Sequence, residues 1–412
     1  MALKNLASVG MPMLAVALSA VILGSSALTA SAQGPQPFVP GPDHCLLVKN
    51  SEARKMCQYA RAQYYQGNYR GALPAMQKAV ALSPREGIMR VVLSFILVRY
   101  ESLGVAEREA RQARQDGAPD HIALPQLFAV MIRRHEEINL LNEFPEPAAG
   151  AKDAVASDIW QGRGRALESL GRLPEAAVAM DHSLSLSRDA DGLLVRSKIA
   201  LKQNDPALAG KLADEAYRLE PKTAAVMVAK LGQLERANDT AGVLALSSQM
   251  IKLYPAFSDP VVFRVNAFLK QNQDAKAKAE VEAYLARRPR AGVGLYYRAV
   301  LLSRAKDKKG AAQIIQTFPL QFVRDYPEFG LQMAQIAFDN GNTEIAAGIL
   351  GAGLGAAPDR TDMRLKLAEL RLAQDAPQAA QLLLRPVEDS KDPRVQKLVG
   401  QVRARIAKDR AF

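Results

Sequence analysis

The chain has 412 residues, of which 49% are hydrophobic and 23% charged, so its composition excludes disorder for most of its length. Lys and Arg number 54 against 42 Asp and Glu, which gives a formal net charge of +12. This charge favours acidic surfaces, anionic polymers or membrane headgroups without choosing among them. The length fits two or three globular domains, or one elongated array of repeats.

The first 32 residues have the pattern of a secretory signal peptide. Lys4 gives a weakly positive start, residues 13–23 form an apolar core, and Ala-Ser-Ala at 30–32 precedes Gln33 as a cleavage pattern. We therefore expect cleavage after Ala32 and a periplasmic mature protein. The alternative is an uncleaved membrane anchor, because residues 9–28 are uncharged and about long enough to span a bilayer.

Two cysteines follow the predicted signal peptide. Cys45 and Cys57 are twelve positions apart, and an even count in an exported chain favours a disulfide over free thiols. The bond would tie a proline-rich linker, residues 33–52, to the first helix after it. A metal site that includes His44 is the alternative, but the paired C-x-x-C spacing of zinc sites is missing.

The middle of the chain repeats with a fixed period. Pro221, Pro255 and Pro289 stand at steps of 34, and each intervening segment has an apolar run, a polar turn and a second helical run. This self-similarity predicts stacked helix-turn-helix units over residues 53–392, each burying its apolar face against its neighbours. The predicted units are 53–84, 87–118, 157–188, 190–221, 224–255, 258–289, 292–322, 327–358 and 361–392.

Three further segments complete this reading of the chain. Residues 122–142 are apolar with helical period and predict a shortened repeat, followed by a loop. Residues 318–327 interrupt the register between two prolines. Residues 393–412 alternate cationic and apolar side chains and predict the polar-faced capping helix that the end of a repeat array requires.

Small residues and turn residues recur at fixed offsets in these units, and small side chains there let two helices pack closely. They are Ala60, Gly67, Tyr69, Ala72, Ala79 and Pro84, then Gly171, Leu173 and Ala176, then Ala334, Gly341, Ala346 and Pro358. In these residues the chain resembles the tetratricopeptide-repeat family. The resemblance implies an all-α fold, a right-handed α-solenoid of about nine to ten helix-turn-helix repeats with a C-terminal capping helix.

A narrower resemblance rests on the exported start, the degenerate early repeats, and residues 283–289 leading into 294–302. In this order the chain is similar to the periplasmic tetratricopeptide protein of PEP-CTERM/exosortase exopolysaccharide systems, whose members are considerably longer. The resemblance implies a role in exopolysaccharide or surface-export assembly.

The sequence lacks the patterns that indicate catalysis. The histidines are His44, His121, His135 and His182, and His135 lacks a partner four residues on, as a zinc-protease helix would supply. Phosphate-loop, nucleophile-elbow and strand-linked dinucleotide motifs are missing as well. We therefore expect no enzyme, no cofactor and no metal. Because the chain is predicted to be exported, we also expect no nucleic-acid partner.

Cations recur in register near the ends of the first helices of four successive units. We call Lys202, Arg236, Lys270 and Arg304, which stand at steps of 34, the cation column. The family resemblance implies that this position lines a concave groove. Two interpretations stay open: cations in a last helical turn are favoured by the helix dipole wherever they face, or the column binds an anionic partner.

Other residues join this predicted groove. Arg165 and Lys198 add charge one turn earlier, and Arg61 occupies a groove position of the first unit. Tyr64 could stack on a sugar ring or fill space between helices. The predicted function is a non-catalytic exported scaffold that binds envelope proteins in the groove. The alternative is direct binding of an acidic polysaccharide, and membrane contact is expected only if the signal segment is retained.

Overall fold

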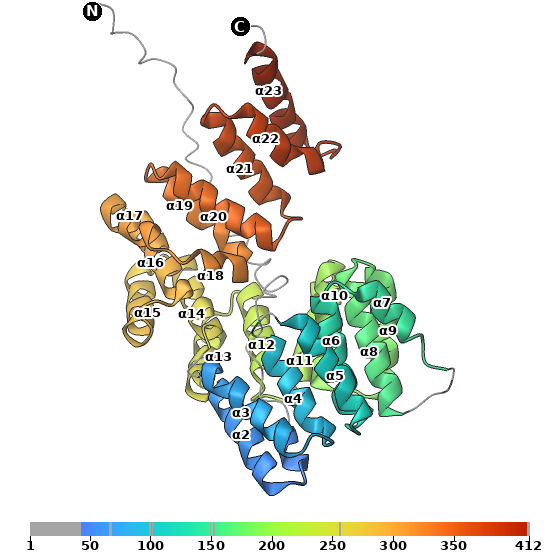
Figure 1. The fold of residues 1–412 in the computed structure, drawn as a ribbon. Helices are drawn as coiled ribbons and strands as arrows, with labels where there is room; N and C mark the ends of the chain where they lie inside the picture. Colours follow the sequence, from blue (N-terminus) through green and yellow to red (C-terminus); the bar gives the residue numbers. More distant parts are fainter. Residues whose placement is uncertain are drawn as a thin grey trace, which may run out of the picture. The chain divides into compact units, whose positions relative to one another are not determined.

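The computed structural model describes residues 43–65, 68–98, 100, 102–148, 150, 153–254 and 257–409. The predicted signal peptide, residues 33–42 of the linker, Gly67 and Pro255 lie outside the described residues. Within them the protein has 22 α-helices and three 3-10 helices, with no strand (Figure 1). In this part of the chain, no helix is long and apolar enough to cross a bilayer.

The helices pack as consecutive pairs, each made of a first helix, a tight turn and a second helix. A short 3-10 helix, η2 (His44–Leu47), precedes them. The first six pairs are α2 (Ser51–Tyr65) with α3 (Tyr69–Leu82), α4 (Gly87–Val98) with α5 (Leu103–Gln115), α6 (Asp120–Arg133) with α7 (Glu137–Glu143), α8 (Ala154–Ser169) with α9 (Leu173–Leu186), α10 (Ala190–Lys202) with α11 (Pro206–Leu219), and α12 (Ala224–Arg236) with α13 (Thr240–Leu253).

The later helices continue this order. They are α14 (Asp259–Lys270) with α15 (Asp274–Arg287), α16 (Gly292–Arg304) with α17 (Lys308–Gln316), the separate α18 (Leu320–Asp325) and η3 (Pro327–Phe329), α19 (Gly330–Asp339) with α20 (Thr343–Ala356), α21 (Thr361–Ala373) with α22 (Pro377–Leu384), then η4 (Arg385–Val387) and α23 (Pro393–Asp409). The predicted all-α class of repeated helix pairs is confirmed.

The irregular segments differ in detail from the sequence prediction. The shortened repeat at 122–142 consists of α6 and a second helix, α7, of only seven residues. The unit predicted to end at residue 322 completes its second helix at Gln316, and α18 then forms a separate helix. The first helix begins at Ser51, two residues before the predicted unit.

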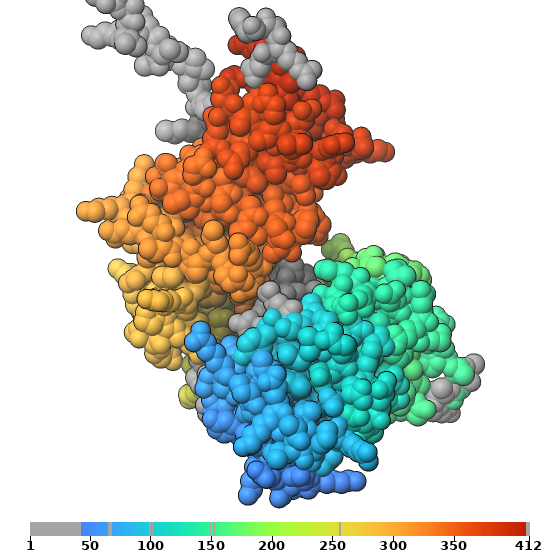
Figure 2. All heavy atoms as spheres, in the orientation of Figure 1, coloured from blue at the N-terminus to red at the C-terminus, as the bar shows by residue number. Residues whose placement is uncertain are grey.

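Contacts divide the chain into two compact units, which we describe separately. The N-terminal unit comprises Gln33–Ala267 and Ala279–Gly294. The C-terminal unit comprises Phe268–Lys278 and Leu295–Phe412. Within each unit, segments of neighbouring colour adjoin in the space-filling view, so that each repeat contacts those next to it in the sequence (Figure 2). This is the contact pattern expected of a repeat array.

The turns between paired helices share a left-handed residue. Asn204, Asn238 and Asn272 have φ of 61°, 56° and 54°, and Lys306 has 59° at the next step of 34. Asparagine tolerates this conformation better than most residues because its short amide can bond locally. An aspartate often follows as the helix N-cap, as at Asp239, whose side chain accepts from the backbone N–H three residues on.

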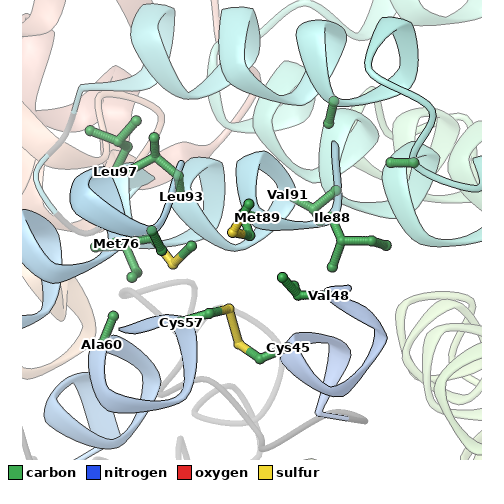
Figure 3. Packing of buried hydrophobic residues seen from close by; sticks show 14 of the residues in the cluster. Cys45, Val48, Cys57, Ala60, Met76, Ile88, Met89, Val91, Leu93 and Leu97 are labelled. Carbon is green, nitrogen blue, oxygen red and sulfur yellow. A yellow bond between two sulfur atoms is a disulfide. The ribbon is translucent and has the colours of Figure 1, made fainter. Parts of the chain in front are cut away.

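Small residues set the distance between α8 and its neighbours α6 and α9. A Cβ added at Gly162 in α8 would lie 2.3 Å from the ring of Phe128 in α6, and one at Gly164 would lie 2.6 Å from the sulfur of Met180 in α9. Both glycines therefore permit close packing inside a helix. The apolar core continues to the N-terminal end, where Met76 and Met89 pack near Cys45 and Cys57 (Figure 3).

Candidate interaction surface

The first helices of the N-terminal unit form a shared surface. Besides its own partner, each of α4, α6, α8 and α10 contacts the next first helix along the chain. Side chains on the free sides of these helices therefore line one face, which we call the first-helix face. Of the predicted groove residues of this unit, Arg165 lies on α8 and Lys198 and Lys202 lie on α10, whereas Arg61 and Tyr64 lie on α2 and Arg236 lies on α12.

The charges on the first-helix face include a buried carboxylate between two lysines. Glu168, near the end of α8, lies 3.0 Å from the Nζ of Lys198 and also pairs with the Nζ of Lys202. Its side chain is only 6% exposed. Burial alone would raise the pKa of Glu168, but the two lysines hold that pKa below its ordinary value. Burial lowers the pKa of Lys198, and Glu168 opposes that shift.

A second ion pair bridges the same two repeats. Arg165 Nη2 lies 2.5 Å from Asp191 Oδ2, to which the amide of Gln161 also donates over 3.2 Å. Asp191 is 68% exposed, so this pair faces solvent. Lys198 and Arg165 thus each lie opposite a carboxylate of a neighbouring repeat.

Two acidic side chains nearby have raised pKa values. Burial, helped by repulsion from Asp189, raises the pKa of Asp158 to about 7. The Oδ2 atom of Asp158 is buried without a hydrogen-bond partner among the described residues. Burial also raises the pKa of Asp189, although the backbone N–H of Gly192 opposes it. The sequence analysis missed these carboxylates, because nothing in a helical run distinguishes a covered aspartate from a solvated one.

The cation column falls in both units. Lys202 and Arg236 belong to the N-terminal unit, whereas Lys270 and Arg304 belong to the C-terminal unit. Arg236 and Lys270 are both partly buried, and burial lowers the pKa of Arg236 while Glu235 beside it opposes the shift. Arg304 holds Asp274 through two hydrogen bonds of 2.9 Å. Lys202 and Arg304 are therefore each neutralised by a carboxylate of the preceding repeat.

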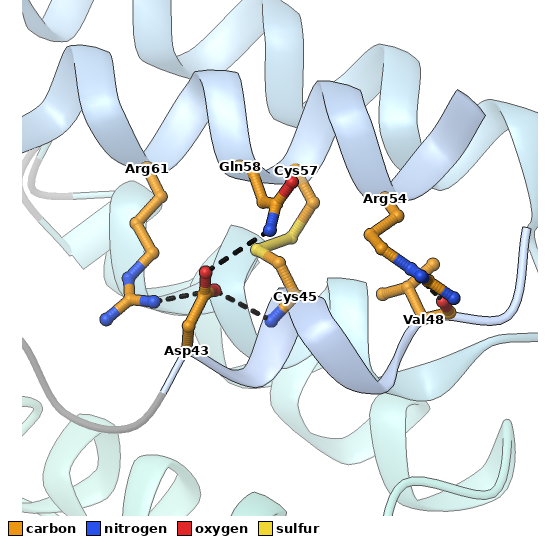
Figure 4. Close-up of a disulfide and its surroundings, with 7 residues drawn as sticks. All are labelled: Asp43, Cys45, Val48, Arg54, Cys57, Gln58 and Arg61. Carbon is orange, nitrogen blue, oxygen red and sulfur yellow. Dashed lines mark hydrogen bonds and ion pairs between the residues drawn. A yellow bond between two sulfur atoms is a disulfide. The ribbon is translucent and has the colours of Figure 1, made fainter. Parts of the chain in front are cut away.

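Arg61 and Tyr64, predicted for the groove of the first repeat, are engaged by other parts of the chain. Arg61 Nη1 lies 2.6 Å from Asp43 Oδ1, and its side chain is 15% exposed (Figure 4). The ring of Tyr64 makes edge contacts with Tyr69 and Phe95, with centroids 5.2 and 5.0 Å apart. Tyr64 thus fills space between helices, the structural alternative considered for it.

The two cysteines are joined. The Cys45–Cys57 disulfide has an S–S distance of 2.02 Å and ties η2 to α2 (Figure 4). Among the residues that the structure describes, no group of three His, Cys, Asp or Glu side chains could hold a metal ion. His182 instead stacks on Trp160, with ring centroids 4.6 Å apart, and His135 takes the left-handed position of a turn.

Comparisons with known proteins agree with the repeat architecture. A model of the tetratricopeptide-repeat family matches residues 331–393, which include α19 to α22. No curated protein sequence matches the chain significantly.

Solved structures of similar fold have low sequence identity and modest superposition. Yeast Tom70 is 11% identical with a TM-score of 0.46, over 88% of this chain and 97% of that one. PilF of Pseudomonas aeruginosa is 15% identical, with a TM-score of 0.34 over 52% and 96%. A tetratricopeptide-repeat protein of Parabacteroides merdae is 12% identical, with a TM-score of 0.37 over 74% and 100%. The matched residues 331–393 form successive helix pairs, so this segment of the chain contains tetratricopeptide repeats.

Proposed function

We propose that the protein is a non-catalytic scaffold that binds segments of other proteins along the first-helix face. The observation that supports this most directly is the mixed charge of that face in α8 and α10. Arg165, Lys198 and Lys202 alternate there with Glu168 and Asp191. A preformed helical wall with both signs of charge and partly exposed apolar side chains suits a polypeptide partner, because little ordering is needed on the scaffold side.

The alternative partner, an acidic polysaccharide, is supported by the formal charge of +12. The ion pairs of the cation column argue against it. A polyanion would have to compete with Glu168 for Lys202 and with Asp274 for Arg304. Each such competition reduces the electrostatic gain and the salt dependence that a polyanion complex would show.

The finer proposal is that the scaffold acts in the periplasm, in an exopolysaccharide or surface-export assembly. The disulfide supports an oxidising compartment, since such bonds persist outside the cytosol. The assembly itself rests on the sequence resemblance through residues 283–302. Cleavage after Ala32 and the division into signal peptide, linker, repeats and capping helix belong to the same proposal.

Site-specific photo-cross-linking in intact cells tests this function. A photoreactive residue placed at Gln161 or Leu194 lies one helical turn from Arg165 or Lys198, on the same helix face. Placed at Val178 or Leu219, exposed positions on the second helices α9 and α11, it serves as a matched control. We expect discrete protein adducts from the first pair of positions only. The mass of the chain that carries them should correspond to a mature protein that begins at Gln33.

The adducts distinguish the alternatives. Equal labelling from both pairs of positions would contradict binding on the first-helix face. Adducts that carry sugar polymer and survive protease digestion would establish the polysaccharide alternative instead. A mature mass that includes residues 1–32 would overturn the cleavage proposal.

A further inference from the structure

Residues 43–48, which we call the N-terminal clamp, lie across the first helices of the first two repeats. The clamp contacts both α2 and α4. Arg54, Cys57 and Arg61 recur at spacings of three and four along α2, so they share one face of that helix, and all three hold the clamp (Figure 4).

Asp43, Cys45 and Val48 of the clamp each make a different kind of contact with α2: an ion pair, a disulfide and a hydrogen bond to the backbone carbonyl. Asp43 pairs with Arg61 at 2.6 Å and accepts weakly from the Gln58 amide at 3.5 Å. Cys45 is fully buried in its bond to Cys57. The carbonyl of Val48 accepts from Arg54 Nε at 2.7 Å.

The clamp also makes apolar contacts with the helices beneath it. The Val48 side chain is fully buried in the cluster that includes Ile88, Met89 and Val91 of α4 (Figure 3). Leu46 and Leu47 point the other way and are 60% and 56% exposed. Asp43, Cys45 and Val48 thus face the helices, whereas Leu46 and Leu47 face away from them.

The chemistry of the covered surface resembles a binding site more than a core. A helix face that is always buried is ordinarily apolar, because each buried polar group must find a partner. Around the buried Cys57, the face of α2 beneath the clamp presents two guanidinium groups and an amide, from the partly exposed Arg54, Arg61 and Gln58. All three can be hydrated when the clamp leaves, so the surface does not depend on this one occupant.

We propose that the surface of α2 and α4 beneath the clamp is a peptide-binding site that the clamp occupies in cis. It accepts another chain only when the Cys45–Cys57 bond is open. The partner segment has a carboxylate, a small apolar residue two positions on and a branched apolar residue three positions further, with a carbonyl for Arg54. This inference rests on the proposed scaffold function and names one binding site for it.

The disulfide decides whether exchange can occur. Lys49 and Asn50 donate backbone N–H bonds of 2.6 and 3.1 Å to Glu86, which holds the end of the clamp close to the start of α4. A ligand on so short a tether has an effective concentration of roughly the mM order. Opening the bond needs a dithiol donor, which gives two electrons and two protons to the sulfurs, yields two thiols and itself becomes a disulfide.

A peptide-binding measurement on the full chain tests the proposal. The probe is a fluorescent peptide with the sequence of residues 42–50 and serine in place of Cys45. The receptor is the full chain with Asp43→Ala and Val48→Ala, which weaken the clamp and retain both cysteines. We expect fluorescence anisotropy to show at least tenfold tighter binding after dithiothreitol treatment than before it. A probe whose aspartate is replaced by alanine should lose that gain.

Controls separate this proposal from the scaffold function. Adding Arg61→Gln to the receptor should weaken binding of the probe in the reduced state, while circular dichroism reports whether each receptor is folded. If the double variant does not fold, the Cys45→Ser chain with Asp43→Ala is the second receptor, compared with the oxidised wild type. The proposal would be overturned if the reduced and oxidised receptors bound the probe with equal affinity, or if the probe without its carboxylate bound as tightly. Either result would leave the cross-linking result on α8 and α10 unaffected.

Discussion

Two carboxylates on one helix, Asp158 and Glu168 of α8, show how surroundings decide the behaviour of a side chain. Glu168 meets Lys198 and Lys202, so its pKa stays below the ordinary value in spite of burial. Burial raises the pKa of Asp158 to about 7, and repulsion from Asp189 and Asp120 adds to this shift. The same element therefore carries one anion that the fold favours and one that it disfavours.

The replacement Asp158→Asn should change how stability depends on pH. The folded chain retains a proton on Asp158 up to about pH 7, whereas the unfolded chain releases it near 3.8. This group therefore costs stability as the pH rises from about 4 to 7, and asparagine removes that cost. Because Asp158 is partly exposed, we discount the effect to about 1–2 kcal/mol.

Urea midpoints at pH 5 and pH 8 check this expectation. The free energy of unfolding of the variant should exceed that of the wild type by more at pH 8 than at pH 5. An offset between the two chains that is the same at both pH values would contradict the environment described for Asp158.

At the residue scale, the positions of the cations could be predicted from the sequence more readily than the carboxylates that pair with them. Lys202 follows from the step of 34, and the same step one repeat earlier falls on Glu168. That signal could have been read, since residues at one register position of adjacent repeats become neighbours. Asp43, the partner of Arg61, could not be found this way, because it lies outside the repeats and its contact depends on how η2 folds back.

At the scale of the element, the turn between paired helices is the best defined unit of the chain. A left-handed residue changes the chain direction, and the N-cap after it satisfies the first free N–H groups of the second helix. Asn238 with Asp239 shows the pairing most simply. Lys306 departs from it, because a lysine takes the left-handed position before the N-cap Asp307.

The replacement Lys306→Asn should therefore stabilise the C-terminal unit. Asparagine occupies left-handed backbone at lower cost than lysine, and we expect a gain of about 0.5–1 kcal/mol. Thermal unfolding would show it as a raised midpoint. Lys309→Asn, a matched change inside α17, should lower the midpoint slightly, since asparagine is a poorer helix former. A midpoint unchanged or lowered by Lys306→Asn would show that the turn is not strained.

The element order could be predicted from the sequence wherever the period holds. The helix pairs from α8 to α15 follow from proline spacing and turn residues. The separate helix α18 could not be placed, because the residues around Phe322 have no counterpart in other repeats. Arg61 is predicted from the sequence to line a groove, whereas in the structure it pairs with Asp43 of the clamp, a contact that no periodicity encodes.

At the scale of the whole molecule, the core is a series of local clusters, each shared by adjacent repeats. The last cluster joins Leu365 and Ala368 of α21 and Leu384 of α22 to α23. The division into two units was not evident from the sequence, because the period of 34 runs without a break through α14 to α16.

Removal of residues 393–412 should loosen the last repeat selectively. It uncovers the apolar surface of α21 and α22 that Val395, Leu398 and Val402 bury, and each such side chain contributes about 1.5–3 kcal/mol. Hydrogen exchange should accelerate in α21 and α22 and stay unchanged in α2 to α12, because neighbour contacts carry stability in a repeat array. Protection that is unchanged in α22, or lost throughout the chain, would contradict a capping role for α23.

The Cys45–Cys57 bond also determines how the protein responds to mechanical load. A pull on the N-terminal segment reaches Cys45 and passes through the two sulfurs to Cys57, inside the first helix. The segment between them is shielded from tension, and the chain from Cys45 to Cys57, which are 12 positions apart, would measure about 40 Å when fully extended. Under load, an oxidised molecule held by its two ends would therefore be shorter than a reduced one by about that length. In the oxidised molecule the force would enter the first helix at Cys57, in its middle, instead of at its start.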